Sequence, residues 1–375
     1  MTLAPTTDVL ERVQALGAFL DEQANVADDL GRLPDETAVR LRESGIMRLL
    51  QPRDFSGLEA TPMDWFRSVL EVGLHSGSAA WVCGVVGVHP FEIALGTRQL
   101  QEEIWGSDPD TWVASPYAPF GRARPVEGGY LFNGRWPWST GTSHCEWAVL
   151  GGLITDQEGT PLPHDQGTRH FFLPKTDYTT LPDEWDIAGL SGTGSFDVVV
   201  KDAFIPDHRV IDPRDLESGA AAAQAGRSDS ALYRMPFNLM FSGTIAAGAL
   251  AIARGGLESF IAYSRVRQTR MNHVVSMDPH QLASLGAAAA DMDAGLVQFM
   301  NDTERVWALV EAGQPVSLDL KIEVRRNQVR SVQRSISALD EIMRHAGGAA
   351  MSRSNPLQRF WRDAHTGAGH GANVA

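Results

Sequence analysis

Residues 128–152 read GGYLFNGRWPWSTGTSHCEWAVLGG and contain two short runs of aromatic and aliphatic residues, separated by Pro, Gly and small polar residues. Runs of this kind are typical of β-strands, and Glu127-Gly128-Gly129 is typical of a hairpin turn. Similar runs continue on both sides and do not alternate with helical segments. The pattern predicts a compact antiparallel β domain and not a Rossmann fold, with strands near Trp112–Ser115, Tyr130–Phe132, Trp147–Leu153, Arg169–Leu173 and Phe196–Val200.

The chain before this domain has the apolar periodicity of helices. Pro34 is followed by two acidic residues, which favours a helix start at that point. We expect this helix to turn Val39, Leu41 and Ile46 inward. The stretch Ser78–Leu95 is apolar almost all round, which predicts a central, buried helix.

After the β domain, an Ala/Gly-rich segment at Gly219–Gly226 indicates a linker, and helical periodicity then lasts to about Ala350. The uncharged run Met235–Ala253 is interrupted by Pro236 and several glycines. It falls short of the roughly 20 strongly apolar residues that a membrane span needs, so we expect a buried helix and no membrane partner. The sequence thus predicts an α+β fold in three units: helices over 1–110, the β domain over 111–214, and helices over 227–375.

Composition limits the possible functions. The formal net charge of −14 leaves no excess of cations for a phosphate backbone, so no nucleic-acid partner is expected. Cys83 and Cys145 form neither a disulfide framework nor a metal-binding spacing, and the histidines show no HxxxH or HExxH pattern, so no metal site is expected. We see no signal-peptide pattern at the N-terminus. Together these features indicate a cytoplasmic protein.

Four segments, in this order, resemble the acyl-CoA dehydrogenase superfamily: 128–152 quoted above, DEWDIAGLSGTGSFDVVVKDAFIP at 183–206, YSRVRQTR at 263–270 and NPLQRFWRDAH at 355–365. Within it, the chain is most similar to the oxygenase components of the two-component, group D flavin-dependent aromatic monooxygenases. The resemblance covers nearly the whole chain from residue 41. It implies an N-terminal helical domain, a central antiparallel β domain, a C-terminal helical bundle and a homotetramer.

The resemblance places several residues beside a flavin ring. Ser139, with Thr140 as the next candidate, stands where a hydroxyl hydrogen-bonds the N5 edge of the ring. Ser115 stands where dehydrogenases carry a Thr-Glu-Pro contact, here without its acid. Thr193 and Ser195 lie in a glycine-rich segment that permits close approach to the cofactor. The alternatives are a β-domain core at 136–138 with Ser139 starting a turn, a plain loop at Ser115 and a tight turn at 192–195.

Further residues are implied for the cofactor's phosphates. Arg267 matches a position that reaches the phosphates of a neighbouring subunit's cofactor, and a guanidinium suits that role. The pair Gly347-Gly348 resembles glycines that let the phosphates approach the backbone. The alternatives are a solvated helix charge for Arg267 and a helix C-terminus for the glycines. No nicotinamide-binding fingerprint is present, so a separate NAD(P)H-flavin reductase is expected as partner.

The segment after Asp363 separates two kinds of chemistry. Many acyl-CoA dehydrogenases place a carboxylate base there, yet no Asp or Glu follows Asp363, and His370 stands immediately before the expected position. A phenol has a pKa of about 10, and an imidazole with a pKa of about 6.5 can accept its proton. The resemblance therefore implies His370 as the substrate-side base, with His365 as the alternative.

His89, in the apolar run VVGVHPFEIAL, is the second candidate catalytic residue, because the hydroxylases keep a substrate-contacting histidine on that helix. A buried core histidine is the alternative. His144 and Trp185 are expected to be structural. Candidate apolar walls are Trp65, Trp81, Trp138, Trp361 and Phe91, although most large aromatic side chains serve the core.

The expected function is the oxygenase half of a two-component monooxygenase. Reduced FMN, or reduced FAD, would react with O2 to a C4a-hydroperoxide in a site that excludes water, and a phenolic, indolic or polyketide-type ring would be hydroxylated. The first alternative is an acyl-CoA dehydrogenase or related flavin oxidase with its base elsewhere. The second is a catalytically silent assembly member of the fold.

Overall fold

The computed structural model of the chain describes residues 6–267 and 278–374. Its first part is helical. Hydroxyl side chains cap two of the helix starts: the Thr61 hydroxyl accepts the Asp64 N–H, and the Ser76 hydroxyl accepts the Ala79 N–H. The helices are α1 Thr6–Ala15, α2 Gly17–Leu30, α3 Asp35–Ser44, α4 Pro62–Gly73, α5 Gly77–Gly87, α6 His89–Ile93 and α7 Arg98–Trp105, with short 3₁₀ turns at Ile46–Arg48 and Arg53–Phe55.

Two sequence predictions in this region are refined. The stretch Ser78–Leu95 is buried throughout, as predicted, but it forms two helices, α5 and α6, that meet just before Pro90, where a proline interrupts the hydrogen-bond ladder. Leu41 and Ile46 are buried, whereas Val39 is 48% exposed. The prediction for Val39 was wrong because the face of α3 that packs against the protein is narrow and does not include that position.

The middle of the chain forms one eight-stranded sheet in the order β6-β7-β3-β2-β4-β5-β8, with β1 beside β4. All five predicted strands are present. The Glu127-Gly128 turn joins β2 to β3 as predicted, with Gly128 at a positive φ of 76°. The strands are β1 Val113–Ala114, β2 Gly121–Val126, β3 Gly129–Ser139, β4 Trp147–Ile154, β5 Thr168–Pro174, β6 Thr179–Leu181, β7 Phe196–Pro206 and β8 Val210–Ile211; the short helix α8 spans His164–Gly167.

The sheet is mixed, which corrects the purely antiparallel prediction. β4 pairs in parallel with both β1 and β2, while the pairs β2–β3, β3–β7, β4–β5, β5–β8 and β6–β7 are antiparallel. The reason is a connection that strand patterns do not reveal. The chain leaves β1, passes over β4 as a loop at 115–120, and re-enters the same edge of β4 in the same direction as β2.

The last part of the chain is helical again. The predicted linker at Gly219–Gly226 contains a short helix with Ala221 and Ala222 buried, because alanine is a strong helix former and small enough to pack closely. The helices are α9 Pro213–Ser218, α10 Ala220–Gln224, α11 Phe237–Val266, α12 Pro279–Glu311, α13 Leu318–Ala346 and α14 Pro356–Ala368. Helix α11 is long and apolar enough to span a membrane by composition, but 72% of its apolar window is buried inside the protein, as expected of a core helix.

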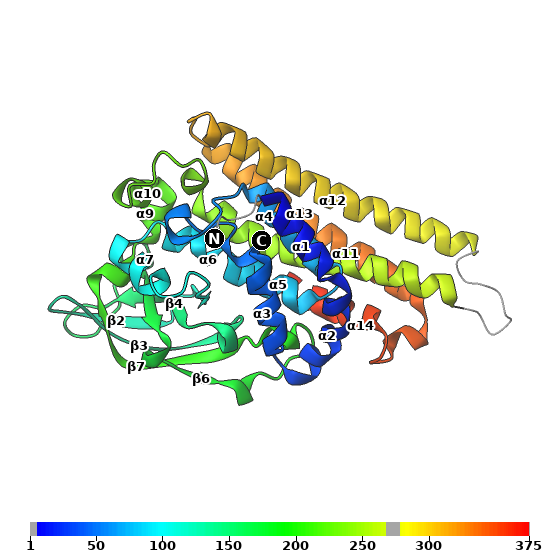
Figure 1. Cartoon of the computed structure of the whole chain (residues 1–375), viewed down its shortest axis with the longest axis horizontal. Helices are drawn as coiled ribbons and strands as arrows, with labels where there is room; N and C mark the ends of the chain where they lie inside the picture. The colour runs from blue at the N-terminus through cyan, green and yellow to red at the C-terminus, as the bar shows by residue number, and fades with distance from the viewer. Residues whose placement is uncertain (1–5, 268–277, 375) are drawn as a thin grey trace.

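The long helices α11, α12 and α13 run side by side along one side of the molecule, and the sheet lies at the other (Figure 1). One hydrophobic core joins the N-terminal helices to α11–α14, and a second, smaller core lies within the sheet, around Phe132, Trp136 and Phe171. The helices before and after the sheet therefore share a core. The unit boundaries at residues 110, 214 and 227 stay a prediction.

Candidate active site

A cavity of about 640 Å³ opens where the sheet meets α5, α11 and the end of α14. This volume is in the range of small-molecule sites. Among the described residues, its lining contains no Asp, Glu, Lys or Arg. Its walls are mainly aromatic, and its polar groups are few: the aromatic residues are Trp81, Tyr117, Phe120, Trp138, Trp185 and Phe241, and the polar ones are Ser115, Thr140, Thr193, Ser195, Thr366 and His370.

A row of hydroxyl groups crosses one wall of the cavity. The hydroxyls of Thr140 and Ser195 lie 3.0 Å apart, and those of Ser195 and Thr193 lie 2.7 Å apart. Thr193 then donates to the Leu190 carbonyl at 2.7 Å, and the Gly141 N–H donates to the Thr193 carbonyl at 3.0 Å. These bonds join the end of β3 to the loop before β7, so residues more than fifty positions apart form one polar strip in an otherwise apolar wall.

Ser139 and Thr140 have different positions. Ser139 is fully buried and is not part of the cavity lining, and its hydroxyl has no hydrogen-bond partner among the described residues. Thr140 faces the cavity and belongs to the hydroxyl row. The structure thus brings the second sequence candidate, and not the first, to the cavity wall.

A bulge at the end of β3 explains this arrangement. The pairing of β3 with β7 shifts register between Trp136 and Ser139, and Trp138 has a positive φ of 67°. A bulky residue in this backbone region is strained, and such strain concentrates at functional sites. The bulge leaves Trp138 64% exposed along the cavity, while Trp136 is fully buried and donates to the Gly151 carbonyl at 2.8 Å. The predicted β-domain core therefore applies to Trp136 and not to Trp138.

The loop after β1 forms the opposite wall with Ser115, Pro116 and Tyr117. It can lie flat on β4 because residue 151 is glycine: a Cβ there would come within 1.9 Å of the Tyr117 carbonyl oxygen. The Gly151 N–H in turn donates to the Pro116 carbonyl at 3.0 Å. Ser115 is thus in the lining, as the resemblance implied.

His370 is the titratable histidine of the lining, and it lies in the turn that follows α14. Its ring packs near Trp81 and Phe241, with ring centres 6.0 Å and 6.4 Å away. Burial and, second, the Arg325 guanidinium hold the pKa of His370 below its usual value, so the ring is neutral at pH 7. Its Nδ1 accepts the Ala372 N–H at 3.1 Å. A neutral ring that accepts at Nδ1 carries its proton on Nε2 and presents a donor there.

The other two candidate histidines lie outside the lining. His365 is 40% exposed, forms an ion pair with Asp340 at 2.9 Å, and packs against Trp361. His89 is fully buried, with Nδ1 against the Val113 carbonyl. Burial lowers the pKa of His89 to about 4, and its ring meets the edge of Tyr117 at 5.7 Å between ring centres. His89 therefore lies behind the wall that Tyr117 forms.

The predicted phosphate-binding residues come together at the C-terminal end of α13. Arg267 donates to the His345 carbonyl at 2.9 Å, and a Cβ at Gly347 would lie 2.4 Å from its guanidinium. Gly347 has a positive φ of 71°, and no heavy atom of the described residues lies within 4 Å of a Cβ built at Gly348. A cation thus lies beside open backbone, the arrangement that a phosphate needs. The last three residues of the YSRVRQTR motif lie outside the described residues.

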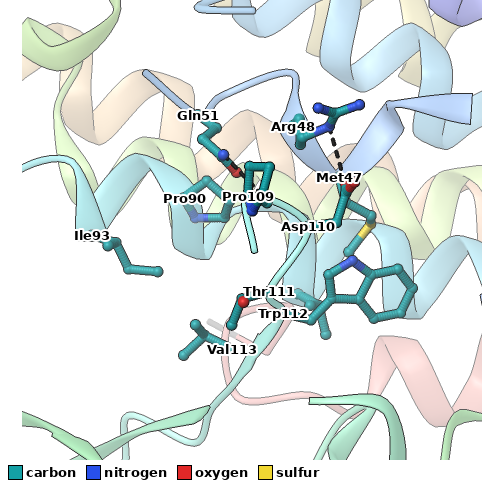
Figure 2. Close-up of a pocket in the computed structure, with 11 residues that line it drawn as sticks. Met47, Arg48, Gln51, Pro90, Ile93, Pro109, Asp110, Thr111, Trp112 and Val113 are labelled. Carbon is teal, nitrogen blue, oxygen red and sulfur yellow. Dashed lines mark hydrogen bonds and ion pairs between the residues drawn. The ribbon is translucent and has the colours of Figure 1, made fainter. Parts of the chain in front are cut away.

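A second hollow, under the segment that leads into β1, is too small for a ligand. Figure 2 shows its lining, with the Arg48–Asp110 ion pair at 2.9 Å across one side. Its volume of about 10 Å³ is at most that of one water molecule. This hollow is packing between α6 and the β1 segment.

Sequence reasoning missed several residues of the main cavity. Trp185, expected to be structural, lies in the lining, as do Tyr117 and Phe241. Trp185 also donates from Nε1 to the Ser191 carbonyl at 2.7 Å, so it both packs and faces the site. Tyr117 is two residues after Ser115, and this short distance along the chain is the sequence signal that was available.

Comparisons agree with the geometry along nearly the whole chain. Residues 243–374 match the family described as acyl-CoA dehydrogenase, C-terminal domain. A pigment production hydroxylase of Rhodococcus erythropolis is 40% identical over 98% of this chain and 93% of its own length. The flavin-dependent monooxygenase, oxygenase subunit HsaA, of Rhodococcus jostii (strain RHA1) is 37% identical, covering 97% of this chain and 94% of its own. The solved structure of XiaF from Streptomyces sp., in complex with FADH2 and glycerol, has a TM-score of 0.91 at 26% identity and covers 98% of this chain and 92% of that one.

The fold is that of the acyl-CoA dehydrogenases. Within that superfamily, the chain belongs to the flavin-dependent monooxygenases and is an oxygenase component that uses reduced flavin. The expectation of an oxidoreductase of this branch is confirmed.

Proposed function

We propose that the chain hydroxylates a small aromatic compound that carries no net charge at its ring substituents, with reduced flavin from a separate reductase. The observation that carries this proposal is the lining of the cavity: aromatic walls, a hydroxyl row on one side, His370 on another, and no charged carboxylate or basic side chain among its described residues. A charged substrate would lose its hydration there without gaining an ion pair.

The described residues fit a flavin ring along the hydroxyl row. Thr140, Ser195 and Thr193 offer donors and acceptors in a strip of the cavity wall, and Trp138 and Ser115 line the same cavity. Arg267, Gly347 and Gly348 suit the cofactor's phosphates, and the resemblance assigns this part to a neighbouring subunit's cofactor. When bound, reduced flavin supplies the two electrons with which O2 is activated.

The chain's own residues bind, orient and shield the reactants. The aromatic walls hold the substrate ring and exclude water. His370 donates from Nε2 to the oxygen of the neutral phenol and so orients the ring, whose carbon is the nucleophile; the proton that this carbon loses ends in the water that leaves. Over a complete turnover, one oxygen atom of O2 forms the new C–OH bond, the other leaves as water, and the flavin leaves oxidised. This proposed donor role differs from the expected role of His370 as proton acceptor, which stays a prediction.

Acyl-CoA dehydrogenation is less well supported. That reaction requires a carboxylate that faces the substrate's α-carbon, and no Asp or Glu is among the described lining residues. The nearest acid on α14, Asp363, is buried with Oδ1 bonded to the Leu190 N–H at 2.6 Å. Its position is behind the loop that carries Thr193.

The assembly and location belong to the same proposal. Relatives named as oxygenase subunits support a separate NAD(P)H-dependent flavin reductase as partner. A role of Arg267 toward a neighbour's cofactor requires an oligomer, and we propose a homotetramer, to be measured by sedimentation. Cys83 and Cys145 are buried free thiols, which fits the reducing cytoplasm.

The test is rapid mixing of the protein with chemically reduced FMN, or with chemically reduced FAD, and then with O2 and 2-naphthol. We expect an absorbance spectrum distinct from those of reduced and oxidised flavin before reoxidation, and a hydroxylated naphthol as product. The flavin that yields product at the lower concentration is the natural cofactor. Reoxidation at the rate of free flavin, with hydrogen peroxide and no product from any neutral phenol tested, would contradict the proposal.

Thr140 and Ser139 provide a matched pair for the flavin contact. Thr140→Val removes a hydroxyl of the row and keeps the shape, so reduced flavin should bind about threefold to tenfold more weakly, as the loss of one hydrogen bond predicts. Ser139→Ala removes a buried hydroxyl that has no partner in the described part of the chain, and binding should change by less than about twofold. Fluorescence titration measures both. If Ser139→Ala weakened flavin binding more than Thr140→Val, the flavin contact would be assigned to Ser139.

A further inference from the structure

Three polar side chains meet directly behind the cavity wall that Tyr117 forms. Glu92 is fully buried on α6, and its Oε1 lies 2.5 Å from His170 Nδ1 on β5. The Tyr117 hydroxyl donates to the other carboxylate oxygen of Glu92. The three residues come from a helix, a loop and a strand, so the contact joins the helical core to the sheet at the edge of the site.

This cluster is not explained by stability. A buried carboxylate carries a desolvation cost of several kcal/mol, and apolar residues of similar volume often stabilise a fold as well or better. Within residues 6–267 and 278–374, Glu92 has no ion pair with a lysine or arginine, and its contacts are with His170 and Tyr117. The cluster fixes the orientation of its side chains, because a carboxylate with both oxygens hydrogen-bonded holds each partner in one orientation.

The side chain held in this way is central to the aromatic wall. The Tyr117 ring lies against His170, tilted by 34° with centres 4.5 Å apart, and meets Phe241 nearly perpendicularly, at 5.0 Å and 89°. His89 meets it edge-on from behind. Phe241 in turn packs against His370. The orientation of Tyr117 therefore sets the surface that faces a substrate ring opposite the His370 donor.

The hydroxyl of Tyr117 remains a donor under all ordinary conditions. Burial and, second, the Glu92 carboxylate raise the pKa of Tyr117 well above its usual value. Tyr117 therefore does not ionise toward the substrate, and its hydroxyl stays committed to Glu92. The ring, and not the hydroxyl, is what it presents to the cavity.

We propose that the buried Glu92–His170 pair is a positioning device that fixes the Tyr117 ring in the cavity wall and thereby sets how an aromatic substrate lies against His370. Glu92, His170 and Tyr117 are positioning residues for specificity and coupling; they take no part in proton transfer. This inference rests on the proposed function for its kinetic consequence, but its structural and binding consequences do not require turnover.

The first test is a double-mutant cycle on binding of 2-naphthol, measured by fluorescence with the full-length protein. Tyr117→Phe removes the hydroxyl bond and keeps the ring, and Glu92→Leu removes the acceptor. Each should weaken binding about threefold to tenfold, and the double variant should be no weaker than the weaker single variant, because both remove one interaction. Glu92→Gln keeps an acceptor for Tyr117 and should restore binding to within about twofold.

Tyr130→Phe is the matched control, because Tyr130 lies on β3 outside the cavity lining and packs, half-buried, against the sheet's own core. In turnover, Tyr117→Phe should lower the product formed per flavin oxidised and raise hydrogen peroxide, at an unchanged rate of flavin oxidation. A Tyr117→Phe protein that matches Tyr130→Phe in both binding and coupling would overturn the inference, as would additive effects in the cycle.

The second test is the crystal structure of Glu92→Leu, or of Glu92→Gln with Tyr117→Phe if the leucine variant does not fold. We expect the aromatic ring at position 117 to move away from the His170 ring. A ring that keeps its place without the hydroxyl bond would contradict the proposal. If the wild type forms no product while the binding cycle and the ring displacement behave as expected, the proposed function fails and the positioning role stands.

Discussion

At the scale of single residues, His370 illustrates how a role depends on one hydrogen bond. Its place was found from the missing carboxylate after Asp363, and the structure puts it in the cavity. Its chemistry was not predictable, because the Ala372 N–H that binds Nδ1 is positioned only by the turn after α14. That bond leaves the proton on Nε2 and makes the neutral ring a donor.

This arrangement predicts a pH dependence. Because the pKa of His370 is lowered from 6.5, the ring is neutral above that pH and gains a proton on Nδ1 only below it. Protonation opposes the Ala372 N–H and disturbs the turn. Product per flavin oxidised should therefore be constant above pH 6.5 and fall as the pH drops through the lowered pKa.

The His370→Gln variant is the control for this profile. It keeps a donor but cannot titrate, so its coupling should be lower than that of the wild type and flat over roughly pH 5 to 8. A profile for His370→Gln that falls in parallel with the wild type would assign the titration to another group. Coupling in the wild type that rises on acidification would contradict the donor role.

At the scale of elements, α14 links two sides of the site. His370 follows its C-terminal end, and Asp363 in its middle accepts the N–H of Leu190, whose carbonyl accepts the Thr193 hydroxyl. A second anchor beside it joins Arg362 to Asp28 at 2.8 Å. The helix thus holds the hydroxyl row and the substrate-side histidine in one frame.

Asp363 gives a stability prediction for this element. Burial raises the pKa of Asp363 to about 6 from its usual value of 3.8. Its contribution to stability is fully present below pH 3.8 and is lost as the pH rises through 6, a loss of about 3 kcal/mol for roughly 2 pKa units. Asp363→Asn keeps an oxygen for the Leu190 N–H, so it should be more stable than the wild type above pH 6.

Denaturant unfolding at two pH values measures this effect. The difference between Asp363→Asn and the wild type should be up to about 3 kcal/mol near pH 8 and close to zero near pH 4. Asp363→Ala, which removes the acceptor, should lack this gain and weaken flavin binding as the Leu190 loop loosens. An asparagine variant that is less stable than the wild type at pH 8 would refute the account.

Elements with a clear local signal were predicted well, and those that depend on distant partners were not. The helix cap at Thr61 and the turn at Gly128 each depend on residues only a few positions apart, so the local sequence is sufficient to specify both. The bulge that separates Trp136 from Trp138 arises from pairing with β7, some sixty residues away, and no local pattern marks it. That bulge determines that Thr140 faces the cavity and that Ser139 is buried beside it.

At the scale of the whole molecule, the order of helices, sheet and helices and the resemblance to a flavin-dependent family could be inferred from the sequence alone, because periodicity and ordered motifs are local properties. The cavity could not, since its walls come from α5, α11, α14, the sheet and two loops. The Glu92–His170–Tyr117 contact also spans 78 residues between its ends. Only tertiary packing decides which side chains of each element face one another, and therefore which hydroxyls line the cavity and which nitrogen of His370 is left without the Ala372 N–H.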